Sequence, residues 1–425
     1  MIFLRGMNLK NSINKYSKSK NARTVITNFS WLAVSQVAGY VFPLLTIPYL
    51  ARVIGAEGFG LIAFAIAIIA WIQTIVDWGF NFTATRDVAQ CNGNKEDISV
   101  IFSNVLWARL ILSFICLIFL FVLSIFIPSF WENRVIIFVT FLMIPGHILC
   151  PEWFFQAIEK MKFITLMNFL LKLIFTFGVF VFIKDSDDVV IQPLLTSGGY
   201  IVCGIISFYL IVIKWKYKIY SPNFQKIFVT LKGSFDIFLN NLLPNLYNSF
   251  SILLLGIWGQ PTSTGILDAG NKFVNICIQL MSVISRAFFP YLSRKIEKHS
   301  FYESFSLWIA GLMSLGLFFA APIVIKIFFT LEFEPAIMIM RIMAISNFFL
   351  TLNSVYGTGY LIIVGKERLL RNINFVLSLF GFAISFPLVY FFDYIGAALT
   401  ITVTRGMIGL TEMYWAKKLK FNPAL

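Results

Sequence analysis

Long, predominantly apolar runs alternate with short polar segments along the whole chain. Each run is about 20 residues long, enough for a helix rising 1.5 Å per residue to cross a hydrocarbon core about 30 Å thick. We predict twelve spans, at about 25–50, 58–78, 104–127, 134–157, 163–183, 189–213, 233–258, 264–290, 304–328, 336–363, 371–392 and 395–416. The predicted fold is therefore an all-α integral membrane protein.

The first two runs carry features that a simple membrane anchor does not need. They lie between Asn28 and Gln90 and are joined by the Gly-containing turn RVIGAEGFG. Pro43 and Pro48 remove backbone donors inside the first run, and Asp77 places a carboxylate at the end of the second. This pair of helices is expected to take part in function.

Composition agrees with a membrane protein. The chain is 59% hydrophobic and 13% charged, with a mean hydropathy of +0.83, whereas soluble domains have about 25% charged residues. The net charge of +14 does not indicate a nucleic-acid partner, because the cations lie in short loops between apolar runs. The five cysteines have no paired spacing, and His147 and His299 are too far apart for a metal or catalytic pair. No cofactor, metal or catalytic residue is expected.

The distribution of Lys and Arg predicts the orientation in the membrane. If the basic N-terminus is cytoplasmic, the outer loops and edges hold only four cations, namely Arg52, Arg134, Lys184 and Lys326. The inner loops and the C-terminal tail hold most of the others, as the positive-inside rule requires. Both ends are therefore expected in the cytoplasm, with the first run as an uncleaved signal anchor.

The longest inner connection divides the predicted spans into two halves of six. The predicted units are a basic N-terminus (1–24), an N-terminal lobe (25–213), a basic linker (214–232), a C-terminal lobe (233–416) and a cytoplasmic tail (417–425). A weak similarity between the segments that begin at Gly60 and Gly265 supports an internal repeat. Chance similarity between two apolar segments is the alternative.

A polar stripe along the eighth predicted span is the sharpest candidate site. Its members recur at helical spacing on one face: Asp268, Asn271, Lys272, Asn275, Gln279, Ser282 and Arg286. Polar groups at membrane depth are costly and usually face a cavity or the interior of the bundle. We therefore predict that the stripe lines a substrate lumen. The alternative is an Asp268–Lys272 ion pair one helical turn apart, with amides that only pack helices together.

Further polar residues in the predicted spans extend this hypothesis. They are Arg109, Lys172, Arg341 and Arg405, together with Asn241 and Asn245 beside the Pro244 break. Ammonium and guanidinium groups suit an anionic solute, particularly a phosphate or pyrophosphate. The alternative for Arg109 and Arg341 is that their long side chains extend out of the apolar layer to the polar interface of the membrane. Arg405 and Glu412, seven residues apart, are placed to pair.

Two carboxylates are candidates for binding a coupling ion, Asp77 and Asp268. Apolar surroundings disfavour a charged carboxylate and so favour proton binding, and the same oxygens could take Na⁺. Capping the cytoplasmic end of its own helix is an equal alternative for Asp77. No nucleotide-binding motif is present, so active transport is expected to use an ion gradient.

Several motifs resemble those of Wzx-type polysaccharide flippases, bacterial proteins in the superfamily of MATE exporters and MurJ-like lipid II flippases. They are NFSWLAVSQVAGYVFPLLTIPYLARVIGAEGFG, WGFNFTATRDVAQ and PEWFFQAIEKMKFIT, with shorter matches at ILDAGNKFVNICIQ and FFPYLSR. One departure is Ala157, where relatives often have Gly after the Gln; Ala is also small.

The resemblance implies two six-helix lobes in a V around a central cavity, in the bacterial inner (plasma) membrane. It implies transport of undecaprenyl-pyrophosphate-linked oligosaccharide from the cytoplasmic to the periplasmic leaflet, coupled to H⁺ or Na⁺, in O-antigen (lipopolysaccharide) or other surface-polysaccharide biosynthesis. The lipid bilayer and the polymerase and chain-length proteins of the same pathway are the implied partners.

Two other functions compete with this one. A MATE-like drug exporter should have an acidic or aromatic cavity, whereas the predicted cavity is cationic. A membrane-embedded glycan polymerase should have a large outer loop for its catalytic groups, whereas the predicted outer loops are short. Both are therefore weaker hypotheses than a flippase.

Overall fold

The computed structural model describes residues 31, 39, 41–91 and 93–421, and helices dominate this part of the chain. The N-terminal half contains Val41–Val53, α3 (Gly55–Asp77), α4 (Phe80–Gln90), α5 (Lys95–Phe126), α6 (Pro128–Glu132), α7 (Arg134–Phe141), α8 (Met143–Leu149), α9 (Glu152–Ala157), α10 (Met161–Phe182), η1 (Ser186–Val190), α11 (Ile191–Tyr209) and η2 (Leu210–Lys214). The C-terminal half contains α12 (Phe224–Leu242), η3 (Leu243–Leu246), α13 (Ser249–Trp258), α14 (Pro261–Leu292), η4 (Ile296–Lys298), α15 (His299–Phe328), η5 (Leu331–Phe333), α16 (Ala336–Leu352), η6 (Asn353–Leu361) and α17 (Glu367–Phe421).

Within the described ranges, nine helical segments are long and apolar enough to cross a membrane. The prediction of an all-α, multi-pass membrane protein is therefore confirmed. The predicted number of twelve stays a prediction, because the first span falls mainly outside the described residues and two other regions differ from a single straight helix.

The first of these regions is the seventh predicted span, which is broken in the middle. Pro244 cannot donate a backbone hydrogen bond, and the chain passes from α12 through the short η3 into α13 at this point. The break predicted at Pro244 is thus confirmed. It turns the polar residues around it towards neighbouring helices.

The second region is α17, which contains the eleventh and twelfth predicted spans. Asp393 has φ 50° and ψ −131°, a conformation that ends one helix and reverses the chain. Beyond the turn the chain folds back on itself, because a Cβ on Gly381 would lie 2.5 Å from Thr404 Oγ1. The segment is therefore an antiparallel helical hairpin.

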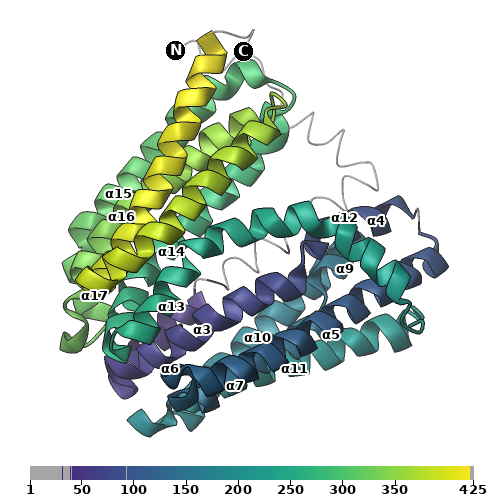
Figure 1. Ribbon diagram of the computed structural model, residues 1–425, viewed down its shortest axis with the longest axis horizontal. Helices are drawn as coiled ribbons and strands as arrows, with labels where there is room; N and C mark the ends of the chain where they lie inside the picture. The colour runs from purple at the N-terminus through teal and green to yellow at the C-terminus, as the bar shows by residue number, and fades with distance from the viewer. Residues whose placement is uncertain (1–30, 32–38, 40, 92, 422–425) are drawn as a thin grey trace.

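The helices form two bundles that diverge in a V (Figure 1). One contains α5, α7, α10 and α11, and the other contains α15, α16 and α17. Helices α3 and α14 join the two bundles and contact each other at two glycines, Gly60 and Gly265. A Cβ on Gly60 would lie 1.6 Å from the Pro261 carbonyl oxygen, and a Cβ on Gly265 would lie 2.0 Å from the Ala56 carbonyl oxygen. The helices can approach this closely only because both positions are glycine.

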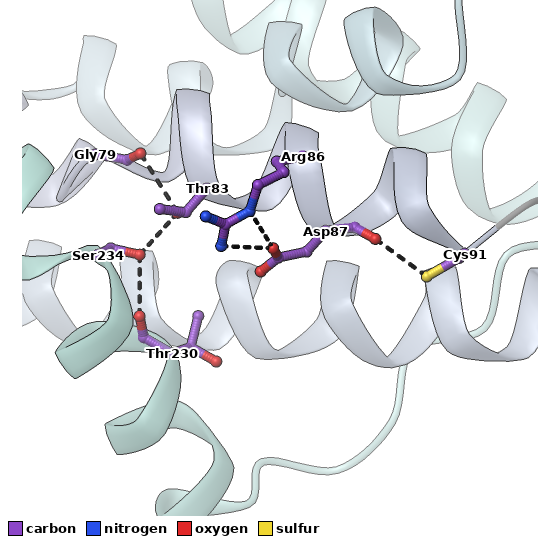
Figure 2. A network of polar contacts seen from close by, with 7 residues as sticks. All are labelled: Gly79, Thr83, Arg86, Asp87, Cys91, Thr230 and Ser234. Carbon is purple, nitrogen blue, oxygen red and sulfur yellow. Dashed lines mark hydrogen bonds and ion pairs between the residues drawn. The ribbon is translucent and has the colours of Figure 1, made fainter. Parts of the chain in front are cut away.

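Helix α12 belongs to the C-terminal half of the sequence but packs against the N-terminal half. Thr83 Oγ1 of α4 lies 2.7 Å from Ser234 Oγ of α12, which also donates to the Thr230 carbonyl (Figure 2). The Trp78 ring stacks on Phe238 with centroids 4.1 Å apart. The segment predicted as a linker, 214–232, is thus helical from Phe224 onward. The boundaries of the two lobes stay a prediction.

Candidate functional site

A cavity of about 810 Å³ lies between α12–η3 on one side and α16, η6 and α17 on the other. We call it the arginine cavity, because Arg371 and Arg405 line it. Its other polar lining residues are Asn240, Asn241, Tyr247, Asn248, Asn353, Thr358, Glu367, Asn374 and Ser378. Two guanidinium groups and five side-chain amides therefore face one space, and Asn241 and Arg405 were among the predicted site residues.

Arg405 is held at the wall of this cavity by two neighbouring helices. Its guanidinium donates to Ser346 Oγ of α16 at 2.9 Å and to Asn248 Oδ1, at the start of α13, at 3.1 Å. The residue is only 8% exposed. Two neutral acceptors hold the guanidinium, and within the described part of the chain no carboxylate forms an ion pair with it. Its positive charge therefore remains available to an anion in the cavity.

The predicted pair between Arg405 and Glu412 is wrong, since no ion pair joins these two described residues. Seven residues place them on one helical face but about 10 Å apart along the axis. Glu412 is fully buried, and its Oε1 accepts from Asn353 Nδ2 at 2.9 Å. Its Oε2 has no hydrogen-bond partner among the described atoms.

A second cavity, of about 350 Å³, gathers part of the predicted stripe on α14. We call it the lysine cavity. Asp268, Lys272, Asn275 and Gln279 line it from α14, and Gly39, Pro43 and Thr46 line it from the first predicted span. Lys272 Nζ lies 2.7 Å from Asp268 Oδ2. The ion pair offered as an alternative to a lumen is therefore present, and the same residues also face a cavity.

The remaining members of the stripe lie outside the lysine cavity. Arg286 is exposed and donates to Ser282 Oγ of its own helix at 2.9 Å. Asn271 Oδ1 is buried without a partner among the described atoms. The stripe does lie on one continuous helix, α14. That it lines a lumen through the whole membrane stays a prediction.

Three other predicted residues lie in separate places. Lys172 Nζ lies beside Gly39, 2.9 Å from where a Cβ would be, and therefore next to the lysine cavity. Asn245 Nδ2 donates to Thr74 Oγ1 at 2.7 Å and so joins η3 to α3. Arg341 lies in a groove between α15 and α16, where its Nε donates to the Phe318 carbonyl at 3.3 Å.

Asp77 and Arg109, predicted to bind an ion and the substrate respectively, form one ion pair. Helix α3 ends at Asp77 because Trp78 and Gly79 both have positive φ. Asp77 Oδ1 accepts from Arg109 of α5 at 2.5 Å, and Oδ2 accepts from Gln73 Nε2 at 2.9 Å. Arg109 is 2% exposed, so the alternative that it extends to the interface is wrong.

His147 of α8 completes this group, to which sequence reasoning gave no role. Its Nδ1 lies 2.9 Å from an Arg109 nitrogen and 2.8 Å from Gln73 Nε2. We call Gln73, Asp77, Arg109 and His147 the N-terminal charge cluster. A lone histidine in an apolar run was its only sequence signal, and its partners come from two other helices.

Comparison with known proteins decides the family. A family model described as polysaccharide biosynthesis protein matches residues 25–296, more than half of the chain. The chain belongs to this family. Members of the family are membrane transport proteins of polysaccharide biosynthesis rather than enzymes, and the predicted resemblance is thereby confirmed.

Relatives of this polysaccharide biosynthesis protein extend over nearly its full length. It is 30% identical to a candidate O-antigen transporter of Escherichia coli (strain K12), over 91% of this chain and 95% of the relative. It is 27% identical to a candidate O-antigen transporter of Shigella dysenteriae, over 88% and 95%. The succinoglycan biosynthesis transport protein ExoT of Rhizobium meliloti (strain 1021) is 22% identical, over 82% and 71%.

Solved structures show the same fold. The lipid II flippase MurJ in an inward closed conformation has a TM-score of 0.70, over 92% of this chain and 87% of MurJ, at 14% identity. A multidrug resistance MATE family transporter in an inward-facing conformation has a TM-score of 0.68, over 93% of this chain and all of that chain, also at 14% identity. The polysaccharide biosynthesis protein therefore has the MATE/MurJ-like fold.

Proposed function

We propose that this protein is a flippase for undecaprenyl-pyrophosphate-linked oligosaccharide repeat units. It moves them from the cytoplasmic to the periplasmic leaflet of the inner membrane by alternating access, using an H⁺ or Na⁺ gradient, in O-antigen or related surface-polysaccharide biosynthesis. The observation that carries the proposal is the arginine cavity, which unites cations and amides between helices of a member of this transport family.

The chemistry of the arginine cavity suits the head of such a lipid. Arg371 and Arg405 supply positive charge for a pyrophosphate, which guanidinium groups bind through several parallel hydrogen bonds. The amides of Asn241, Asn353 and Asn374 can each donate to and accept from sugar hydroxyls. A volume of about 810 Å³ is within the range of ligand-binding sites, roughly 300–1,000 Å³.

The lysine cavity provides a second place for the same anionic head. Lys272 faces it, and Lys172 lies beside it. We propose that the cations along α14, including Arg286, meet the head as it crosses, and that Asp268 or Asp77 binds the coupling ion. Twelve spans in two lobes, 25–213 and 233–416, with both ends cytoplasmic, complete the proposed architecture.

Export of a small organic cation is the alternative that the shared fold leaves open. Such a molecule needs acidic or aromatic groups in its binding site. The arginine cavity has two aromatic residues, Phe82 and Tyr247, but only one carboxylate, Glu367, against two guanidinium groups. The sign of this charge favours an anionic substrate.

Deletion of the gene in its own bacterium tests the proposal. Without the flippase, lipid-linked repeat units should accumulate in the cytoplasmic leaflet and the surface glycan should disappear. Expression of the wild-type protein should restore both, and expression of an Arg405→Ala variant should not. Normal surface glycan in a deletion strain that has no second copy of such a gene would contradict the proposal.

A further inference from the structure

His147 contacts both Arg109 and Gln73 in the N-terminal charge cluster, and ion binding by Asp77 or Asp268 leaves this contact unexplained. We propose that His147 is a proton-binding group of the transport cycle. When neutral it keeps Arg109 on Asp77, and when protonated it replaces Arg109 as the partner of Asp77. This inference rests on the proposed function, because it assigns a residue to ion coupling.

The contacts of His147 define its protonation in the structure. The Arg109 guanidinium can only donate hydrogen bonds, and one of its nitrogens lies 2.9 Å from His147 Nδ1. Gln73 Nε2 also donates to Nδ1, at 2.8 Å. The opposite orientation of the Gln73 amide would place its oxygen against Asp77 Oδ2, where two acceptors would face each other. Nδ1 therefore carries no hydrogen, and the ring is the neutral form with its hydrogen on Nε2.

Adding a proton to Nδ1 makes this arrangement unstable. The new N–H would face two other N–H donors at hydrogen-bond distance, and a positive ring would lie beside the positive Arg109. Asp77 Oδ1 is already 3.8 Å from Nδ1, so a movement of about 1 Å brings these two atoms to hydrogen-bond distance. The protonated ring is thus drawn to the carboxylate and pushes the guanidinium away.

Arg109 has a place to go when it leaves Asp77. A small cavity of about 140 Å³ is lined by Arg109 and His147 themselves and by Asn81, Glu152 and Gln156. The Glu152 carboxylate and the two side-chain amides can accept from the guanidinium there. In the protonated arrangement Arg109 is therefore paired in this small cavity, and the Asp77 carboxylate is paired with His147.

Other charged and titratable groups around His147 act on the same exchange. Asp77 faces it from α3, Arg109 from α5 and Glu152 from α9, while the Tyr200 ring of α11 lies 5.9 Å from its ring. Lys172 of α10 acts on Glu152 electrostatically. These neighbours set how readily the proton binds.

The exchange takes place on a helix that connects the two halves. Asp77 is the last residue of α3, and α3 meets α14 where Gly60 faces Gly265. A change of partner at the end of α3 can therefore alter the angle at which this helix meets the C-terminal half. Proton binding would then bias the protein between its two orientations.

Nitrogen NMR of ¹⁵N-histidine-labelled, tag-free protein in lipid nanodiscs tests the proton site directly. The chain has only two histidines, so a His299→Asn variant identifies the His147 signals. At about pH 8 we expect an unprotonated Nδ1 and a protonated Nε2, and on acidification to about pH 4 a growing fraction of rings with a proton on both nitrogens. A hydrogen on Nδ1 at about pH 8, or an Nδ1 that stays unprotonated throughout, would overturn the proposal.

Transport measurements then test the coupling. In a His147→Asn variant the Asn oxygen can replace Nδ1 as acceptor but cannot bind a proton, so the fold should be kept. We expect a proton gradient to accelerate wild-type transport in proteoliposomes at least about fivefold and to leave the variant unaffected. A gradient response equal to that of the wild type in His147→Asn would overturn the assignment. A wild-type protein that moves no lipid-linked oligosaccharide would instead overturn the proposed function, while the NMR result still decides the proton site.

Discussion

Gly60 of α3 and Gly265 of α14 lie against each other where the two halves of the protein meet. A Cβ on Gly60 would come within 1.6 Å of the Pro261 carbonyl oxygen, and one on Gly265 within 3.0 Å of the Gly60 nitrogen. The two glycines are also the starting points of the segments whose similarity suggested an internal repeat. Residues related by a two-fold axis meet in this way when they lie close to the axis, so this contact supports the repeat.

Gly60→Ala should separate α3 from α14, because its new methyl group has only backbone beside it and backbone cannot rotate away. We expect a loss of about 1–3 kcal/mol in the free energy of unfolding, measured by thermal or denaturant unfolding of the purified protein. Gly311→Ala is the matched control, since nothing lies within 4 Å of its Cβ position on α15. Equal stability of the two variants would contradict the close contact.

Asp77→Asn should destabilise the protein strongly, since it leaves the buried Arg109 charge without its counter-ion. Removing one partner of a buried pair costs about 3–5 kcal/mol, and Asp77→Leu with Arg109→Met should recover most of that loss. Asp87→Asn is the control. Asp87 pairs with Arg86 on α4 (Figure 2), and the two side chains are 43% and 63% exposed. That control should change the free energy of unfolding by less than about 1 kcal/mol.

Lys272→Ala and Arg286→Ala should impair transport while leaving the amount of folded protein unchanged. The Lys272–Asp268 pair is partly exposed, at 34% and 26%, and an i,i+4 pair contributes only about 0.5 kcal/mol to stability. We expect transport in a complemented deletion strain to fall at least about tenfold, which is about 1.4 kcal/mol. Wild-type transport in both variants would leave the α14 stripe with a helix-packing role only.

Arg405→Lys should bind a pyrophosphate-headed lipid more weakly than the wild type although the charge is kept. An ammonium group cannot reach Ser346 and Asn248 at once and present a flat pair of donors to a phosphate. We expect roughly tenfold weaker binding in Arg405→Lys and a larger loss in Arg405→Ala, measured by titration in nanodiscs. Arg341→Ala, which changes a groove away from both cavities, should bind nearly as the wild type does.

Much of the helical architecture follows from local sequence. Helix α10 covers Met161–Phe182 against a predicted span of 163–183, and α3 ends at Asp77 as predicted. Helix α5 begins at Lys95, well before the predicted residue 104, because Asn94 caps it and accepts from the Glu96 N–H. Apolar length predicts the part of a helix that is able to cross a membrane but not the polar turns that extend it.

The candidate site was predictable only in part. Hydropathy and helical spacing identified Arg405, Asn241 and Lys272 as polar residues at membrane depth, but not that they lie in two cavities. Which side chains meet depends on how the helices tilt and cross. The contact of His147 with Arg109 joins α8 to α5, and no sequence pattern around either residue indicates it.

Transport of lipid-linked oligosaccharide by the purified protein is the most direct test of the central claim. Proteoliposomes would be loaded with undecaprenyl-pyrophosphate-linked repeat units, and the fraction open to a membrane-impermeant, sugar-cleaving enzyme added outside would be followed with time. We expect wild-type protein to make nearly all of the lipid accessible under an ion gradient, and Arg405→Ala to leave about half of it protected, as in protein-free liposomes. If half of the lipid stays protected although the wild-type protein is folded and reconstituted in the liposomes, the claim is contradicted.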